Sequence, residues 1–207
     1  MTTLVLATSN RGKLAEFRPL LADCGFTLVS QGELGVGDAI ENGHTFIENA
    51  LIKARHACAA TGSPALADDS GLIVDALGGA PGLISAHYAS VHGDAAGNIR
   101  RLLAELAGVP EEKRTARFYS TIVLLRHAED PRPVIAEGIW EGRILDAPRG
   151  TDGFGYDPIF FDPVLNACAG ELPPELKNRV SHRGQALAEL RKHLASGQQL
   201  LRDNRPC

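Results

Sequence analysis

Long apolar runs, closely spaced cysteines and a surplus of basic residues are all missing from this chain of 207 residues. No stretch approaches the ~18 apolar residues of a membrane-spanning helix. The start of the chain lacks the basic and apolar regions of a secretory signal peptide. The 4 cysteines are scattered without C-x-x-C spacing, which argues against a structural zinc site and a disulfide framework. We therefore expect a cytoplasmic protein that does not associate with membranes.

The charge balance narrows the class of ligand. The chain has 21 Lys and Arg against 25 Asp and Glu, a formal net charge of -4. A general nucleic-acid binder usually needs a basic face, so we expect no nucleic acid as partner. A small anionic ligand held by a few local cations stays compatible with this balance. The histidines show no H-E-x-x-H spacing, and Ser70 lacks the G-x-S-x-G setting of a serine nucleophile.

The strand pattern predicts an α/β protein. Hydrophobic residues make up 44% of the chain, enough for a sizeable core, and we predict one domain over residues 1–207. Apolar and β-branched runs predict strands at residues 4–7, 26–29, 65–67, 72–77, 116–125, 133–145 and 159–161.

Helices are predicted between several of these strands. One follows residue 10, and Pro19 should kink or restart it. Another follows a capping box formed by Thr45 and Glu48. Two more are expected over residues 95–106 and, with Ser181 as N-cap, over 183–194. The mixture of helices with adjacent hairpin strands indicates a mixed sheet.

Residues 5–13, VLATSNRGK, carry the clearest chemical signal. They read as a buried strand that ends in a polar turn and opens a helix. The first amides of a helix are unpaired and its dipole is positive there, so this geometry attracts an anion such as phosphate. The full Walker A spacing is missing, and an ordinary strand-to-helix turn with a solvated Lys13 is the alternative.

Asp68 and Asp69 lie between two apolar segments in the run DDSG. Neighbouring carboxylates near buried strands repel each other unless a cation intervenes. Mg²⁺ prefers oxygen ligands and often joins one or two carboxylates to substrate phosphates, so the run favours a magnesium site. The alternative is a β-turn in which an Asp and Ser70 bond to the backbone. Glu41, in the polar loop of residues 38–44, is a candidate second ligand, and a solvated loop glutamate is the alternative for it.

Two further segments could recognise a base. Residues 150–158, GTDGFGYDP, would let backbone approach a ligand, and the Phe154 ring could stack on a nucleobase. The alternative packs Phe154 and Tyr156 in the core. In residues 177–184, His182 and Arg183 could donate to a base carbonyl and Lys177 could meet a phosphate or a base. A basic helix start exposed to water is the alternative there.

Together these segments resemble the inosine triphosphate pyrophosphatases, and the bacterial branch of that family in particular. The resemblance rests on an ordered set that spans nearly the whole chain: residues 6–13, 45–50, 67–72, 78–82, 153–160 and 181–184. It implies an elongated, curved mixed sheet with flanking helices, two lobes around a central cleft, and a homodimer. It also implies Mg²⁺-dependent cleavage of inosine, deoxyinosine or xanthosine triphosphate to the monophosphate and pyrophosphate, which keeps deaminated purines out of nucleic acid.

The resemblance also assigns residues. Glu41 and Asp69 would bind Mg²⁺. Asp69 would orient or deprotonate the attacking water, supported by Asp68, and Lys53 would act with them on the triphosphate. Substrate binding would fall to Thr8, Ser9, Asn10, Arg11, Gly12, Lys13, Ser70, Phe154, Gly155, Tyr156, Asp157, Lys177, His182 and Arg183.

One departure from the family lies at residues 85–88. The family commonly reads Ser-Ala-Arg-Tyr where this chain has Ser85-Ala86-His87-Tyr88. Histidine lacks the fixed fork and permanent charge of arginine, so we assign His87 no role. Two other functions stay open on the residues: a pyrophosphatase for a modified pyrimidine, and a nucleotide sensor without turnover.

Overall fold

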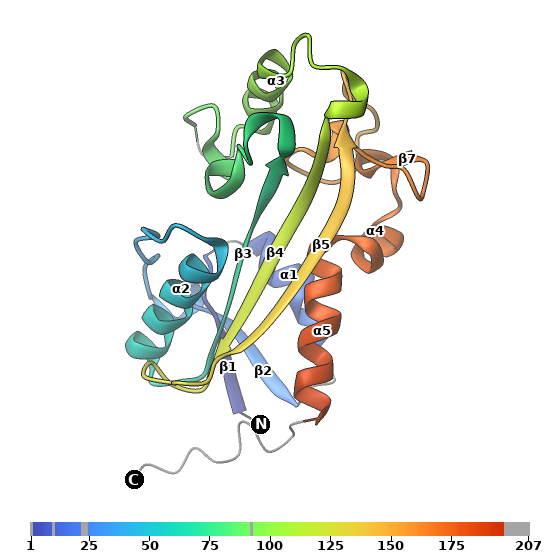
Figure 1. Ribbon diagram of the computed structural model, residues 1–207. Coiled ribbons are helices and arrows are strands. Elements are labelled where there is room, and N and C mark those ends of the chain that lie inside the picture. Colours follow the sequence, from blue (N-terminus) through green and yellow to red (C-terminus); the bar gives the residue numbers. More distant parts are fainter. Residues whose placement is uncertain (1, 10, 22–24, 92, 197–207) are drawn as a thin grey trace. The chain divides into compact units, whose positions relative to one another are not determined.

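The chain forms a mixed arrangement of strands and helices (Figure 1). The computed structural model describes residues 2–9, 11–21, 25–91 and 93–196. The strands are β1 Thr2–Leu6, β2 Phe26–Ser30, β3 Ala65–Val74, β4 Thr115–Leu125, β5 Val134–Ile144, β6 Phe160–Asp162 and β7 Ala167–Cys168. The α-helices are α1 Arg11–Leu21, α2 Phe46–Thr61, α3 Ala95–Glu105, α4 Pro174–Val180 and α5 His182–Ser196.

The strands form one 7-stranded sheet in the order β2-β1-β3-β4-β5-β6-β7. β1 pairs in parallel with β2 and β3, whereas β6 pairs antiparallel with β5 and β7. The predicted α/β class with a mixed sheet and flanking helices is therefore confirmed.

The chain divides into two compact units, each assembled from separate segments. The first comprises Met1–Asp69, Thr121–Glu137 and Ala186–Cys207, and the second comprises Ser70–Ser120 and Gly138–Gln185. The single domain over residues 1–207 and the two lobes around a cleft stay predictions.

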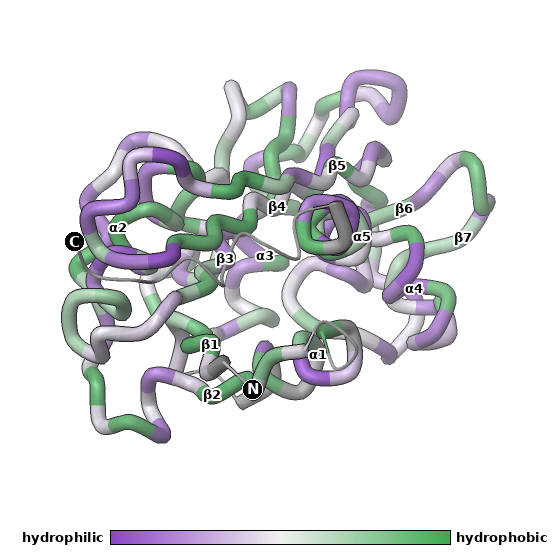
Figure 2. Tube along the Cα trace, turned by 90° about the horizontal axis from the view of Figure 1, so that it is seen from below, coloured by the Kyte–Doolittle hydropathy of each residue, from purple (hydrophilic) through white to green (hydrophobic). Residues whose placement is uncertain are grey.

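In the first unit, alternating side chains supply two separate cores. Leu4, Leu6 and Leu66 point to one face, where they pack with α1 and α5 through residues such as Phe17 and Leu190. Their neighbours in sequence point to the other face and pack with α2, in a cluster that includes Val5, Ala7, Ala65, Ala67, Ala54 and Cys58. Successive strand side chains point to opposite faces, so near-continuous apolar runs bury both faces of the sheet. Figure 2 shows α2 and α5 on opposite sides of these strands.

The second unit has an aromatic core. Phe118 on β4 and Trp140 on β5 pack with Phe160 on β6, and the Trp140 indole N–H donates to Asp162 Oδ2 at 2.7 Å. Leu102 of α3 closes this cluster. This core supports the loop and the helix start that carry the predicted base contacts.

The local predictions meet several corrections. β3 continues through residues 68–71, so the β-turn alternative for that run is wrong. α1 continues through Pro19 to Leu21 and does not restart at it. In the predicted capping box, Thr45 Oγ1 accepts from the Glu48 amide at 3.1 Å, but the Glu48 carboxylate accepts from the amide of His44, at 2.6 Å.

Among the residues that the structure describes, no helix is both long enough and apolar enough to span a bilayer.

Candidate functional site

Asp68 and Asp69 do not share a site face, because they are consecutive residues of β3. Asp68 points with Leu66 toward α1, and Asp69 points with Ala67 toward α2. Each carboxylate meets a lysine from the helix on its own side: Lys13 of α1 for Asp68 and Lys53 of α2 for Asp69. The repulsion expected between neighbouring carboxylates is thus relieved by geometry and by two separate cations.

Lys53 joins the two predicted metal ligands. Its ammonium lies 2.7 Å from Asp69 Oδ1 and 2.8 Å from Glu41 Oε2. Burial raises the pKa of Asp69, and the negative charge of Glu41 adds to that effect while Lys53 opposes it. Burial alone would lower the pKa of Lys53, but the two carboxylates outweigh it and raise that pKa. The three side chains therefore form one charge-coupled group.

This group offers two of the ligands that a magnesium ion needs. Glu41 and Asp69 offer carboxylate oxygens that converge on one cation, which is the donor set that Mg²⁺ commonly takes from a protein. Across the described part of the chain, no three His, Cys, Asp or Glu side chains gather as a metal-binding group. A divalent ion here would need substrate phosphates and water as its remaining ligands.

The predicted phosphate turn lies at the carboxyl end of β1. Leu6 is in register with Leu66 of β3, the Ala7 amide donates to the Leu66 carbonyl, and the chain turns at Thr8, whose amide donates to the Leu6 carbonyl. Lys13, in the first turn of α1, lies 2.9 Å from Asp68 Oδ2. Carboxyl ends of parallel strands are the usual place for a ligand in such sheets. The turn therefore leads into the helix whose Lys13 pairs with Asp68, whereas Lys53 pairs with Asp69 on the other side of β3.

Not every residue of the turn can be placed. Asn10 lies outside the described residues, as does the side chain of Arg11, while Gly12 is in the first turn of α1. Ser9 is exposed and donates its hydroxyl to Asp38 Oδ1 at 2.9 Å.

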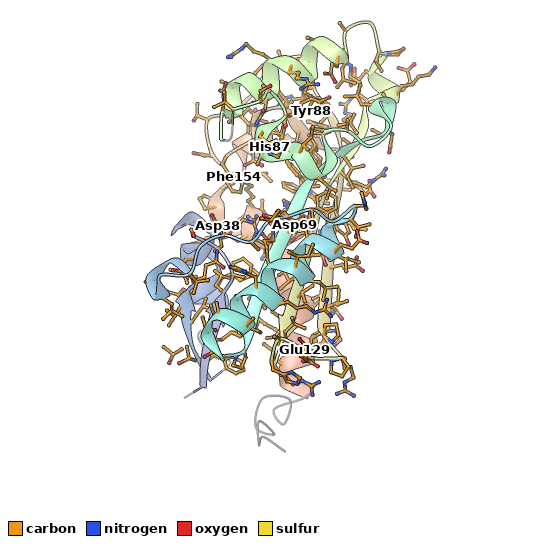
Figure 3. All side chains as sticks on the ribbon, turned by 90° about the vertical axis from the view of Figure 1, so that its left-hand side faces the viewer. Asp38, Asp69, His87, Tyr88, Glu129 and Phe154 are labelled. Carbon is orange, nitrogen blue, oxygen red and sulfur yellow. The ribbon has the colours of Figure 1, made fainter. Side chains whose placement is uncertain are left out.

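Asp38 is a residue that the sequence analysis missed. It also accepts from Gln31 Nε2 at 2.6 Å, so it fastens the turn to the segment after β2. Its only sequence signal is a place in the same polar loop as Glu41. Figure 3 shows Asp69 at one end of the first unit and Glu129 at the other.

The second unit builds the predicted base site around Asp157. Its buried carboxylate accepts from the Phe154 amide at 2.6 Å and from the Lys177 ammonium. Gly153 has φ +82°, and a Cβ there would come within 2.3 Å of Asp157 Oδ2, so only glycine fits. This tight turn leaves the Phe154 ring 58% exposed, which contradicts the core-packing alternative for that ring (Figure 3).

Two cations lie beside the exposed Phe154 ring. Lys177 Nζ is 4.7 Å and the Arg183 guanidinium carbon 5.8 Å from its centre. Arg183 also donates to Ser70 Oγ at 3.2 Å, and it is buried although it starts a helix. His182 stacks on Phe118 with ring centres 4.8 Å apart. The helix-start cations are therefore built into the unit, which contradicts the alternative of a basic start exposed to water.

Tyr156 differs from Phe154, since its ring is buried and its hydroxyl donates to the Ser85 carbonyl at 2.9 Å. For Tyr156, the core-packing alternative holds. Gly155 lies between the two rings with φ +60°.

Comparison with known proteins identifies the family of this chain. The chain matches the Ham1 family over residues 4–193. The chain belongs to the Ham1 family. A Ham1 protein of known structure from Coxiella burnetii is 47% identical and superposes with a TM-score of 0.91, covering 95% of this chain and 100% of that one.

Curated relatives of this Ham1 chain carry a functional name. A dITP/XTP pyrophosphatase of Xanthomonas campestris is 62% identical over 194 residues, which are 94% of this chain and 98% of the relative. A dITP/XTP pyrophosphatase of Vibrio cholerae is 53% identical over 192 residues, 93% of this chain and 96% of the relative. The predicted family is thus confirmed over nearly its full length.

Proposed function

We propose that this Ham1 chain is a Mg²⁺-dependent hydrolase of inosine, deoxyinosine and xanthosine triphosphates. It cleaves between the α- and β-phosphates and releases the nucleoside monophosphate and pyrophosphate. Its role is to clear deaminated purine nucleotides from the cytoplasmic pool. The observation that carries the proposal is the group of Lys53, Glu41 and Asp69, in which two carboxylates and one ammonium converge.

In the first unit, different residues bind the phosphates, stabilise their charge and activate the attacking water. The turn that begins at Thr8 and the start of α1 bind phosphate oxygens, because the positive end of a helix dipole attracts an anion. Lys13 and Lys53 add positive charge, which stabilises the charge that develops on those oxygens in the transition state. Asp69 holds the attacking water and accepts its proton as oxygen attacks the α-phosphorus.

Magnesium would be held by Glu41 and Asp69. When bound, it would neutralise phosphate charge and polarise the phosphorus–oxygen bonds.

The residues of the second unit recognise the base. The exposed Phe154 ring stacks on it. Arg183 is a permanent donor, so it pairs with an acceptor oxygen at the six position of the base. Hypoxanthine and xanthine carry that oxygen, whereas adenine carries a donor amine. Guanine also carries the six-position oxygen, so it must be rejected through its two-amino group. We expect that group to meet the backbone near Phe154 or Lys177 unfavourably.

A panel of nucleotides tests this function. With Mg²⁺, we expect pyrophosphate release from inosine and xanthosine triphosphates to exceed that from adenosine, guanosine and pyrimidine triphosphates in kcat/KM. Preference for a modified pyrimidine would overturn the base assignment. Tight nucleotide binding without any pyrophosphate release would indicate a sensor and overturn the hydrolase.

We also propose that the enzyme acts as a homodimer, an inference that rests on the family alone. Sedimentation velocity at micromolar concentration should give the mass of two chains, twice 22.0 kDa. A species of one chain at every concentration would contradict it.

A further inference from the structure

The segment Gly82–His87 has no part in the chemistry above, yet it runs along one edge of β3. The Val74 amide donates to the Ala80 carbonyl, and the Leu72 amide donates to Ser85 Oγ at 3.0 Å. A side-chain hydroxyl here replaces a strand partner, since a buried backbone N–H needs an acceptor. Ser85 Oγ in turn donates to the Gly82 carbonyl at 2.5 Å.

The backbone of Ser85 holds a second element. Its carbonyl accepts from the buried Tyr156 hydroxyl at 2.9 Å and from Asn98 Nδ2 of α3 at 3.3 Å. Tyr156 lies between the exposed Phe154 and the buried Asp157 in the loop that is predicted to meet the base. Hydrogen bonds to β3 and α3 therefore hold Ser85 in place, and its carbonyl in turn holds the loop of residues 150–158 through Tyr156.

The same residue reaches the other half of the base site. Leu72 follows Ser70 by two residues on β3, and Ser70 Oγ accepts from Arg183. One serine thus joins the strand that orients Arg183 to the loop that presents Phe154. All of these residues belong to the second unit.

We propose that Ser85 and Tyr156 are positioning residues that set base discrimination by holding the Phe154 loop in register with Ser70. This role deepens the proposed function and rests on it. Neither residue touches the reacting atoms, so their loss should alter substrate recognition rather than the chemical step.

Tyr156→Phe tests the link, because it removes one hydroxyl and keeps the buried ring. Tyr88→Phe is the matched control: Tyr88 is also buried and lies just after the same segment, but its hydroxyl donates to Glu105 of α3. We expect Tyr156→Phe to raise KM for inosine triphosphate about 10-fold, the scale of one buried hydrogen bond. Its kcat should stay within about twofold of the wild type, because the loop acts on binding rather than chemistry. Its preference over guanosine triphosphate should narrow, whereas Tyr88→Phe should keep all three values.

Hydrogen exchange of the free protein, followed by mass spectrometry, reads the same link without substrate. Peptides covering residues 150–158 should exchange faster in Tyr156→Phe than in the wild type or Tyr88→Phe. Unchanged exchange and KM in Tyr156→Phe would overturn the proposal, as would equal changes in both variants.

If Tyr156→Phe does not fold, Ser85→Ala takes its place with the same expected KM shift, and wild-type behaviour there also overturns the proposal. If the wild type does not hydrolyse inosine triphosphate, the proposed function is wrong. The positioning role of Ser85 and Tyr156 is still tested in that case, because hydrogen exchange is measured without substrate.

Discussion

At the residue scale, the central feature of the first unit is the contact of Lys53 with two carboxylates. Its ammonium meets Glu41 and Asp69 at once, so each carboxylate is neutralised within a partly buried group. Substituting either carboxylate would remove a charge that faces Lys53 and, in the proposed mechanism, a charge that acts on the metal ion and the attacking water. Effects on activity should therefore be large while the fold survives.

Asp69→Asn should lower kcat by about 10²-fold or more, the usual scale for losing a general base. The amide keeps the shape of the side chain but cannot accept the proton of the water. Steady-state kinetics with inosine triphosphate measures the loss, and circular dichroism checks the fold. Asp146→Asn, at an exposed aspartate, serves as control and should keep wild-type activity. Near-normal turnover in Asp69→Asn would remove this residue from the mechanism.

Arg183→Ala should narrow the gap in kcat/KM between inosine and adenosine triphosphates more than the gap to guanosine triphosphate. In the proposed site Arg183 would donate to the six-position oxygen, and an adenine amine there would face a buried cation, which is costly. Arg179→Ala removes an exposed arginine of the neighbouring helix α4 and should leave both gaps unchanged. If Arg183→Ala narrows neither gap, the assignment of the base edge is wrong.

At the element scale, the turn between β4 and β5 is fastened by one buried carboxylate. Asp130 Oδ2 accepts from the Arg126 amide at 3.0 Å and from its Nε at 2.8 Å, and Oδ1 accepts from the Arg132 amide at 3.0 Å. Burial alone would raise the pKa of Asp130, but these donors and the Arg126 charge hold that pKa well below its usual range. The ionised carboxylate therefore stabilises the folded chain.

Asp130→Asn should lower the free energy of unfolding at pH 7 by about 1–3 kcal/mol, the scale of a buried hydrogen-bonding group left poorly satisfied. Because the pKa of Asp130 is lower in the folded than in the unfolded chain, its ionised carboxylate stabilises the fold at pH values above the unfolded-state pKa. This stabilisation is lost as the pH falls below that pKa. The difference from wild type should thus shrink below about pH 4. Urea unfolding at pH 7 and pH 3 measures it.

Glu129→Gln, at the exposed neighbour in the same turn, controls for charge alone and should change stability at neither pH. A difference for Asp130→Asn that persists unchanged at pH 3 would contradict the ionic origin.

The elements that the sequence predicted are those with a strong local pattern. Leu187, Leu190 and Leu194 repeat at helical spacing and are buried in α5, and Ser181 caps that helix through the Gly184 amide. β7 has two residues and α4 has seven, too few for any period to stand out. The turn alternative at residues 68–71 failed because β3 keeps its pairing through polar residues.

The residues that meet in the site are far apart in the sequence, so no local pattern predicts their contacts. Lys13 meets Asp68 across 55 residues, and Arg183 meets Ser70 across 113. Motif resemblance singled out these residues, but only the tertiary fold shows which acid pairs with which lysine. The sequence predicts no role for Asp38 or Ser85, and the importance of both residues follows from their hydrogen bonds.

At the scale of the whole molecule, the division of labour follows the two compact units. The first holds the lysines and carboxylates predicted for phosphate and magnesium, and the second holds the aromatic loop and cations predicted for the base. A dinucleotide or single-stranded nucleic acid would need a longer basic surface, which a chain of net charge -4 does not favour. The proposed substrate, a purine nucleoside triphosphate, has a phosphate part and a base part that correspond to these two sets of residues.

The central claim is hydrolysis of inosine triphosphate by water attack at the α-phosphorus. Phosphorus NMR of the products formed in ¹⁸O-water tests it in one measurement. The account predicts inosine monophosphate and pyrophosphate in equal amounts, with the isotope shift on the monophosphate resonance. Inosine diphosphate and orthophosphate as primary products, or the label on pyrophosphate, would contradict it.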